Sequence, residues 1–345
     1  MADDSPSSGR AAAPAGSIPM AVIGDSNSHS YRDSISFPPG SRERGGALRG
    51  RNLQWVEIVA RMRGGQLDPG PWVAWGRSGN VAWLRESIGL SAGRAPRKED
   101  YLYNFANSGA ACKHLMGDRL GQRFRQVPRL VALMDKDRPR WRNGVVVIRM
   151  GHNDCVAMLD VQARDPASPE LKATTDYCVS QIEAAIGLIH SRHPATRIMV
   201  VGVHSELDYP RWFSLYRSAR ETTNVQTANV AFNCALRKLT SSDPRIAWFD
   251  DSSWIAERWG TRSAEGEPVY KTVNIGTVLR VTNTAGDDLA NAQMADDHAG
   301  LAWNAMWAQS IVARLKDAFD LPLTPISDEE LERFIASQVD QISAP

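Results

Sequence analysis

The sequence predicts an α/β fold built on a mostly parallel β-sheet. Short apolar runs alternate with amphipathic helical segments along the chain, which is the pattern of repeated strand–helix–strand units. The run Val145 to Ile148 is continuously apolar and β-branched, as expected for a strand that helices cover on both faces. A second apolar run, Met20 to Ile23, ends at Gly24 and predicts the first strand.

The other predicted elements follow in chain order from the spacing of apolar residues. Positions three and four apart share one face of a helix, whereas short continuous apolar runs suit buried strands. On this basis we expect, in order, a helix near 53–60, a strand at 101–105, a helix with its apolar face between 178 and 189, strands at 198–201 and 246–249, and a long last helix at 301–319.

We expect one large domain with a short extension at each end. Residues 1–17 are rich in Ala, Ser, Pro and Gly, which predicts a flexible tail. The domain spans 18–320, and two stretches within it, 31–51 and 65–99, are interpreted as loop insertions over the edge of the sheet. Residues 321–345 predict a C-terminal helical extension.

Composition limits the class of partner. The 345 residues include 40 basic and 39 acidic side chains, so the formal net charge is only +1. Proteins that bind nucleic acid carry a concentrated basic excess, which argues against a nucleic-acid partner. No apolar run approaches the roughly 20 residues that cross a bilayer, which argues against a membrane partner. Chemistry on a small molecule is the better expectation.

The cysteines and the N-terminus bear on the compartment. The four cysteines, Cys112, Cys155, Cys178 and Cys234, lie far apart and form no CxxC pair. Because disulfide-stapled domains are short and dense in cysteine, we expect buried free thiols in a reducing compartment. Residues 1–17 lack the basic start and apolar stretch of a signal peptide, which predicts a cytoplasmic protein. A secreted or periplasmic location would apply if a native leader had been lost.

Two polar motifs follow predicted strands, where open α/β sheets bind their ligands. The first, 24–28 (GDSNS), would place Ser26 near the first turn of a helix, whose free backbone N–H groups can stabilise an oxyanion. The same residues also suit an ordinary turn. The second, 104–110 (NFANSGA), contains Gly109, whose N–H can approach a substrate oxygen with no side chain in the way. It also fits a plain strand-to-helix turn.

Two further polar motifs lie later in the chain. In 151–154 (GHND), Asn153 offers amide donors to a developing anion, although Asn and Asp also favour helix N-caps. In 296–300 (DDHAG), just before the last helix, a carboxylate beside His298 can fix the imidazole tautomer and stabilise the imidazolium. A surface ion pair is the simpler interpretation of the same residues.

In this order the four motifs resemble the conserved blocks of the SGNH, or GDSL-type, esterase and lipase superfamily. The resemblance extends over residues 20–319. It implies a three-layer α/β/α sandwich with a flavodoxin-like, mostly parallel sheet. It also implies hydrolysis of carboxylic esters by a serine nucleophile, with no metal and no organic cofactor.

The resemblance assigns roles to matching positions. Ser26 would attack the ester carbonyl, and His298 would accept the serine proton and pass it to the leaving alcohol. The backbone N–H groups of Ser26 and Gly109 and the side chain of Asn153 would form the oxyanion hole. Asp296 would orient the histidine and complete the catalytic triad.

The last block departs from the superfamily pattern. The aspartate usually stands three residues before the histidine, and Ala295 occupies that position here. Asp296 and Asp297 are the nearest carboxylates, and we expect Asp296 to act. Asp297, or a Ser–His dyad with a backbone carbonyl as orienter, are the open alternatives.

The oxyanion glycine has an alternative position. The segment 76–80 (GRSGN) also resembles the Ser-Gly block and would make Gly79 the donor. We prefer Gly109 because a predicted strand precedes it and a helix leads from it towards the Val145 strand.

Three histidines outside the motifs also come into question. His204 follows a predicted strand, so it can line the cleft and contact substrate. His190 and His193 have HxxH spacing, but they close a helix, where cationic side chains suit the helix dipole. Because no third ligand is evident, the sequence predicts no metal site.

The leading hypothesis is a serine ester hydrolase acting through an acyl-serine intermediate. Its expected partner is a small-molecule or carbohydrate ester, and a carbohydrate O-acetylesterase is the first choice. An acyltransferase on the same scaffold, or a lipase or thioesterase, are alternatives. A catalytically silent carbohydrate-binding protein is the non-enzyme alternative, for which Ala295 is the best argument. The sequence leaves the oligomeric state open.

Overall fold

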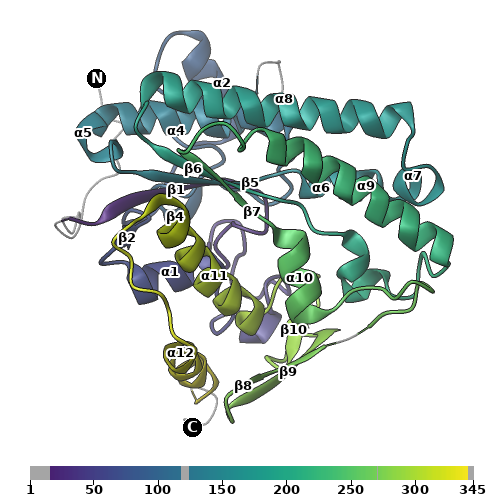
Figure 1. The fold of residues 1–345 in the computed structure, drawn as a ribbon. Helices are drawn as coiled ribbons and strands as arrows, with labels where there is room; N and C mark the ends of the chain where they lie inside the picture. Colours follow the sequence, from purple (N-terminus) through teal and green to yellow (C-terminus); the bar gives the residue numbers. More distant parts are fainter. Residues whose placement is uncertain (1–15, 118–123, 270, 341–345) are drawn as a thin grey trace.

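The computed structural model describes residues 16–117, 124–269 and 271–340 (Figure 1). Its centre is a parallel sheet of five strands in the order β2-β1-β5-β6-β7. These strands are β1 (Ile18–Gly24), β2 (Leu67–Asp68), β5 (Val145–Arg149), β6 (Arg197–Val201) and β7 (Ile246–Phe249). Numbered among themselves they run 2-1-3-4-5, the flavodoxin-like order. The predicted fold class is confirmed.

Helices on both faces of the sheet complete three layers. On one face lie α4 (Gln126–Met134), α8 (Pro169–Arg192) and α9 (Ala219–Lys238) (Figure 1). On the other lie α1 (Trp55–Arg63) and α11 (Leu301–Phe319). The helix predicted at 301–319 has these same bounds.

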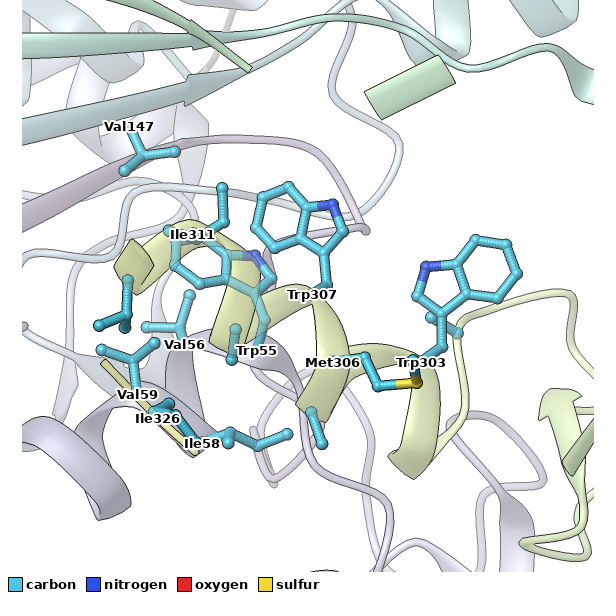
Figure 2. Close-up of a cluster of buried hydrophobic side chains, with 14 of the residues drawn as sticks. Trp55, Val56, Ile58, Val59, Val147, Trp303, Met306, Trp307, Ile311 and Ile326 are labelled. Atoms are coloured by element: carbon cyan, nitrogen blue, oxygen red, sulfur yellow. The ribbon is translucent and has the colours of Figure 1, made fainter. Parts of the chain in front are cut away.

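Each face of the sheet has its own apolar core. Val22 belongs to the core shared with α1 and α11, whereas the next residue, Ile23, belongs to the core shared with α4 and α8. Figure 2 shows the first core, in which the rings of Trp55 and Trp307 lie 5.0 Å apart. Burial on both faces explains why the central strands are continuously apolar.

The remaining elements connect or extend this framework. Among the described residues, two smaller sheets lie outside the central sheet: β3 pairs with β4, and β8, β9 and β10 form a sheet that the sequence did not predict. The bounds are η1 (Gly46–Leu48), β3 (Trp72–Trp75), α2 (Gly79–Ser87), β4 (Lys98–Tyr101), α3 (Lys113–Met116), η2 (Asp135–Asp137), α5 (Arg138–Trp141), α6 (His152–Ala157), α7 (Leu159–Arg164), η3 (Glu206–Asp208), η4 (Pro210–Trp212), α10 (Asp251–Trp259), β8 (Thr272–Ile275), β9 (Leu279–Ala285), β10 (Asn291–Gln293) and α12 (Asp328–Asp340).

The prediction of a sheet strand at 101–105 is wrong in part. The second strand of the central sheet is β2, which lies inside the stretch 65–99 that was interpreted as an insertion. The chain does run beside β1 later. There the Val22 N–H donates to Tyr103 O (3.1 Å), and the Val22 carbonyl oxygen accepts from the Phe105 N–H (2.8 Å). With only two paired residues, β2 is too short to give a periodicity signal.

The expectation of four buried free thiols is also wrong. Cys112 and Cys178 form a disulfide with their Cα atoms 5.1 Å apart. Of the other two thiols, Cys155 is buried and Cys234 is exposed. The pairing crosses 66 positions of sequence and follows from the packing of α3 on α8, so no local pattern reveals it.

The two chain ends were predicted as extensions. The C-terminal helix α12 packs against α11, and the Arg63 guanidinium of α1 pairs with Glu330 at 2.6 Å. The predicted tail falls almost wholly outside the described residues. The division at 18–320 stays a prediction. Among the described residues, none of the helices combines the length and the apolar character needed to span a bilayer.

Candidate active site

The candidate site lies where the strand order of the sheet reverses. β1 pairs with β5, so that Gly24 stands beside Arg149 at the carboxyl ends of both strands. β2 flanks β1 on one side, while β6 and β7 continue beyond β5 on the other. Doubly wound sheets bind their ligands at this switch point. Ser26 follows β1 directly, and Asn153 follows β5.

The turn that carries Ser26 is held from several sides. A Cβ on Gly24 would lie 2.7 Å from the carbonyl oxygen of Arg149, so a side chain would force these strand ends apart. The Gln126 amide bonds both backbone groups of Gly24, at 3.0 and 2.8 Å. The Asp25 carboxylate accepts from the N–H of Asn27 at 2.9 Å. This scaffold fixes the backbone on which the Ser26 hydroxyl is mounted.

The Ser26 side chain is 8% exposed. Within residues 16–117, 124–269 and 271–340, its hydroxyl makes no hydrogen bond, including none to His298. Catalytic hydrogen bonds are often long or unaligned without substrate. The hydroxyl is therefore unengaged in this conformation.

The segment 104–110 is tied directly to the Ser26 turn. The Asn107 N–H donates to Gly24 O at 3.1 Å, and the Asn104 amide donates to Ser28 O at 2.8 Å. Gly109 has a φ of +73°, a conformation that side-chain-bearing residues rarely adopt. This geometry delivers the Gly109 backbone to the same edge of the sheet as Ser26.

Asn153 approaches the same segment from β5. It lies in the first turn of α6, and its side-chain amide donates to Ala110 O at 2.8 Å. A primary amide has two N–H donors, so the second is left for a ligand. The structure thus places Asn153 beside the backbone that follows Gly109. Gly79, the alternative, begins α2 after β3, outside the central sheet.

His298 lies in a tight loop between β10 and α11. The Met294 N–H donates to His298 O at 2.7 Å, which closes the loop. The imidazole Nδ1 lies 3.2 Å from the Asp296 carboxylate and 2.9 Å from the Asp296 carbonyl oxygen. Asp297 instead pairs with Arg211 at 3.1 Å. Of the two candidate carboxylates, the structure places Asp296 against His298.

The Asp296 carboxylate is an anion. Burial by itself raises the pKa of this carboxyl group, but hydrogen bonding to His298 and the charge of Arg44 outweigh burial and hold the pKa well below its usual range. A negative charge at this position stabilises the imidazolium that forms when a histidine accepts a proton.

Sequence comparison supplies the family. The model of the GDSL-like lipase/acylhydrolase family matches residues 20–244. This match covers more than half of the chain. The chain belongs to the GDSL-like lipase/acylhydrolase family. It is accordingly a hydrolase of carboxylic esters. The match ends before the loop of Asp296 and His298, whose placement rests on the geometry above.

Several solved structures are also similar. They include a lipase from a goat rumen metagenome (13% identity, 73% of this chain and 90% of the other, TM-score 0.36). Another is a catalytic mutant of an acetylxylan esterase from Geobacillus stearothermophilus (11% identity, 74% of this chain and 89% of the other, TM-score 0.34). A third is an extracellular lipase from Streptomyces rimosus (16% identity, 73% of this chain and 86% of the other, TM-score 0.34). No curated protein matches the sequence. At these identities the structural likenesses carry no argument about substrate.

Arg44 joins the parts of this GDSL-like site, and the sequence did not single it out. It comes from the stretch 31–51, where one arginine among several gave no local signal. Its NH1 lies 2.6 Å from Asp296 Oδ2 and 2.8 Å from His298 Nδ1, and its NH2 donates to Ser108 Oγ at 2.9 Å. The guanidinium also lies over the ring of Phe37, 4.5 Å from its centroid. Arg44 is 3% exposed, so it connects the two loops from within the protein.

His29, three positions after Ser26, is too near in sequence to be the expected base, and the structure gives it a supporting role. Its Nδ1 accepts from the Ser108 N–H at 3.2 Å, while its Nε2 lies 2.9 Å from the Asp33 carboxylate. Burial, helped by the charge of Lys98, lowers the pKa of His29 to about 4. The neutral ring holds the residue that precedes Gly109, and both of its nitrogens are engaged by Ser108 and Asp33.

His204 is buried rather than open to the cleft. It follows β6, as predicted, but is 2% exposed. Its Nδ1 lies 3.2 Å from the Asp251 carboxylate, and its ring lies 4.9 Å from that of His152. Asp251 in turn pairs with Arg149 at 2.8 Å. A substrate contact by His204 stays a prediction, and its immediate neighbours are protein groups.

Proposed function

We propose that the protein cleaves carboxylic esters through an acyl-serine intermediate on Ser26, with His298 as general base and Asp296 as its orienter. The observation that supports this assignment is the meeting of four motifs at one edge of the sheet. Asn107 bonds the Ser26 turn, Asn153 bonds the segment of Gly109, and Arg44 links that segment to the histidine loop.

The first step is attack of Ser26 Oγ on the ester carbonyl. His298 takes the serine proton at Nε2, because its Nδ1 faces Asp296. For this to occur Nδ1 must carry a hydrogen, which it donates to Asp296. Arg44 NH1, which lies 2.8 Å from Nδ1, must then donate to Asp296 Oδ2 alone. The protonated His298 then gives its proton to the leaving alcohol.

The developing oxyanion accepts hydrogen bonds from the backbone N–H groups of Ser26 and Gly109 and from the Asn153 amide. Losing one such donor typically costs about 10²–10³ in turnover. Water activated by His298 then attacks the acyl-serine and releases the acid. The chemistry requires no metal.

We infer a small acyl group on a carbohydrate as the substrate. Trp212 is the candidate for sugar stacking, since it is half-buried and its neighbour Arg211 pairs with Asp297 in the loop of His298.

Labelling of Ser26 tests the nucleophile. A fluorophosphonate probe should add one adduct to Ser26, and 4-nitrophenyl acetate should give a burst that Ser26→Ala abolishes. A rate unchanged in Ser26→Ala would refute the assignment. Ser28→Ala, two residues along the same turn, is the matched control for the labelling position.

Substrate class needs a separate comparison. O-acetylated oligosaccharides should be turned over faster than 4-nitrophenyl esters of long acyl chains, and Trp212→Ala should raise KM only for the sugar ester. Preference for long chains would favour a lipase. Product that forms only when an acceptor alcohol is added would favour an acyltransferase.

The disulfide favours the secreted or periplasmic location over the cytoplasmic one, because structural disulfides persist in oxidising compartments. Titration of the unfolded, unreduced protein should find the thiols of Cys155 and Cys234 only. Four titratable thiols in freshly isolated protein would support the cytoplasmic expectation instead.

A further inference from the structure

Beside the candidate active site lies a cluster of three potential metal ligands. His152 begins α6 after β5, and His204 and Glu206 follow the neighbouring strand β6. One ligand atom from each of these residues lies within 4.8 Å of the other two. The cluster thus assembles at the carboxyl ends of two adjacent strands, from residues 52 and 54 positions apart in sequence.

The cluster contains one ion pair and one unpartnered nitrogen. His152 Nδ1 and Glu206 Oε1 face each other 2.9 Å apart as an ion pair. Across the part of the chain that the structure describes, His204 Nε2 is buried and has no hydrogen-bond partner. Buried polar atoms are almost always paired, so this nitrogen beside the histidine–carboxylate pair indicates a ligand.

The surroundings of His204 suit metal coordination. Its Nδ1 lies 3.2 Å from Asp251 Oδ2, and a hydrogen bond there leaves the lone pair on Nε2. Asp251 is held in turn by Arg149 at 2.8 Å and by the indole N–H of Trp307 at 2.6 Å. A carboxylate behind a ligating histidine fixes the ring orientation and raises the basicity of the metal-binding nitrogen.

We propose that His152, His204 and Glu206 form a Zn²⁺ site. Two imidazoles and one carboxylate are an established zinc donor set that leaves a fourth position for water or another ligand. Zn²⁺ bonds of 2.0–2.2 Å place tetrahedral ligand atoms about 3.4 Å apart. The observed separations, from 2.9 Å to no more than 4.8 Å, bracket this value, so small side-chain rotations suffice.

The site is accessible and lies next to proposed catalytic groups. The His152 side chain is 17% exposed, which gives the ion a path from solvent. His152 adjoins Asn153, and Arg149 of the supporting network donates to the carbonyl of Asn27, next to Ser26. Occupancy of the site is therefore expected to change ester turnover. Binding itself does not depend on the catalytic assignment.

Direct titration tests the site. Protein dialysed against a chelator, then titrated with Zn²⁺ by calorimetry, should bind one ion per chain. His204→Ala and Glu206→Gln should each weaken binding at least 10-fold, the lower bound seen when even outer-shell partners are lost. Co²⁺ should give the intense visible absorption of a four-coordinate site in the wild type, and neither variant should show it.

The helix-end pair His190 and His193 supplies the matched control. The double variant His190→Ala/His193→Ala removes two imidazoles elsewhere and should bind Zn²⁺ as the wild type does. Melting curves establish whether each variant is folded. If His204→Ala does not fold, the Zn²⁺ affinity of Glu206→Gln tests the site. The proposal is overturned if the wild type fails to bind, if binding survives both cluster substitutions, or if the control variant loses it.

Discussion

Replacing Arg44 by methionine should lower kcat for ester hydrolysis about 10- to 100-fold and leave KM unchanged. Arg44 is buried and contacts Asp296, His298 and Ser108, so we expect it to act through these groups and not on the substrate itself. It acts as a positioning residue that holds the carboxylate against the histidine. Methionine has a similar length and keeps the contact with Phe37 while removing the charge.

The magnitude follows from the bonds that are lost. The backbone N–H of Arg44 also donates to Asp296 at 2.8 Å and survives any substitution. The NH1 bond to Asp296 (2.6 Å) and the NH2 bond to Ser108 (2.9 Å) do not survive. A hydrogen bond to a charged group contributes about 1.5–3 kcal/mol. If the equivalent of one such bond is lost from the transition state, turnover falls by the stated 10- to 100-fold.

Burst kinetics with 4-nitrophenyl acetate would measure the acylation step directly. The kcat of Arg44→Lys should lie between that of Arg44→Met and that of the wild type, because a lysine is a point charge and cannot bridge to both Asp296 and Ser108. Arg44 has a φ of +58°, so glycine fits its backbone. Added guanidinium should therefore restore part of the turnover of Arg44→Gly, whereas the same concentration of sodium chloride should not.

Two outcomes would refute this reasoning. One is a folded Arg44→Met protein with kcat within two-fold of the wild type. The other is a raised KM at unchanged kcat, which would mean that Arg44 serves substrate binding.

Three further predictions follow from the structure. Asp296→Asn should lower kcat by about 10²–10⁴, whereas Asp297→Asn, which removes only a surface partner, should leave kcat within about two-fold; equal losses in steady-state assays would contradict the choice between them. Cys112→Ser, made together with Cys178→Ser, should lower the free energy of unfolding by about 4 kcal/mol, because the disulfide closes a separation of 66 residues; urea unfolding with no loss would contradict it. Burial raises the pKa of Glu57 from 4.5 to about 7, so its contribution to stability is full below pH 4.5 and is lost as pH rises through 7. Glu57→Gln should remove up to roughly 3 kcal/mol of this decline between pH 4.5 and pH 8, and an unchanged pH profile of melting would disprove the assigned pKa.

The local pattern of apolar residues was sufficient to predict those helices and strands whose burial is regular along the chain. The strands at Met20 and Val145 are read from continuous apolar runs, because both of their faces are buried. The helix at 301–319 is read from spacing alone. The edge strands β2, β8 and β10 were not predicted, since two to four residues carry little periodicity.

By itself the sequence determined the α/β class, from its alternating apolar runs and helices, and the four polar motifs. Their resemblance to the GDSL-type family was then confirmed by the family match over residues 20–244. Only the tertiary structure placed Asp296 against His298 and Asp297 against Arg211, introduced Arg44, and paired Cys112 with Cys178. The physical reason is that each motif consists of consecutive residues at the end of one strand, so it can be recognised in the sequence. A guanidinium between two loops, or a disulfide between two helices, depends on distances set by packing across the whole domain.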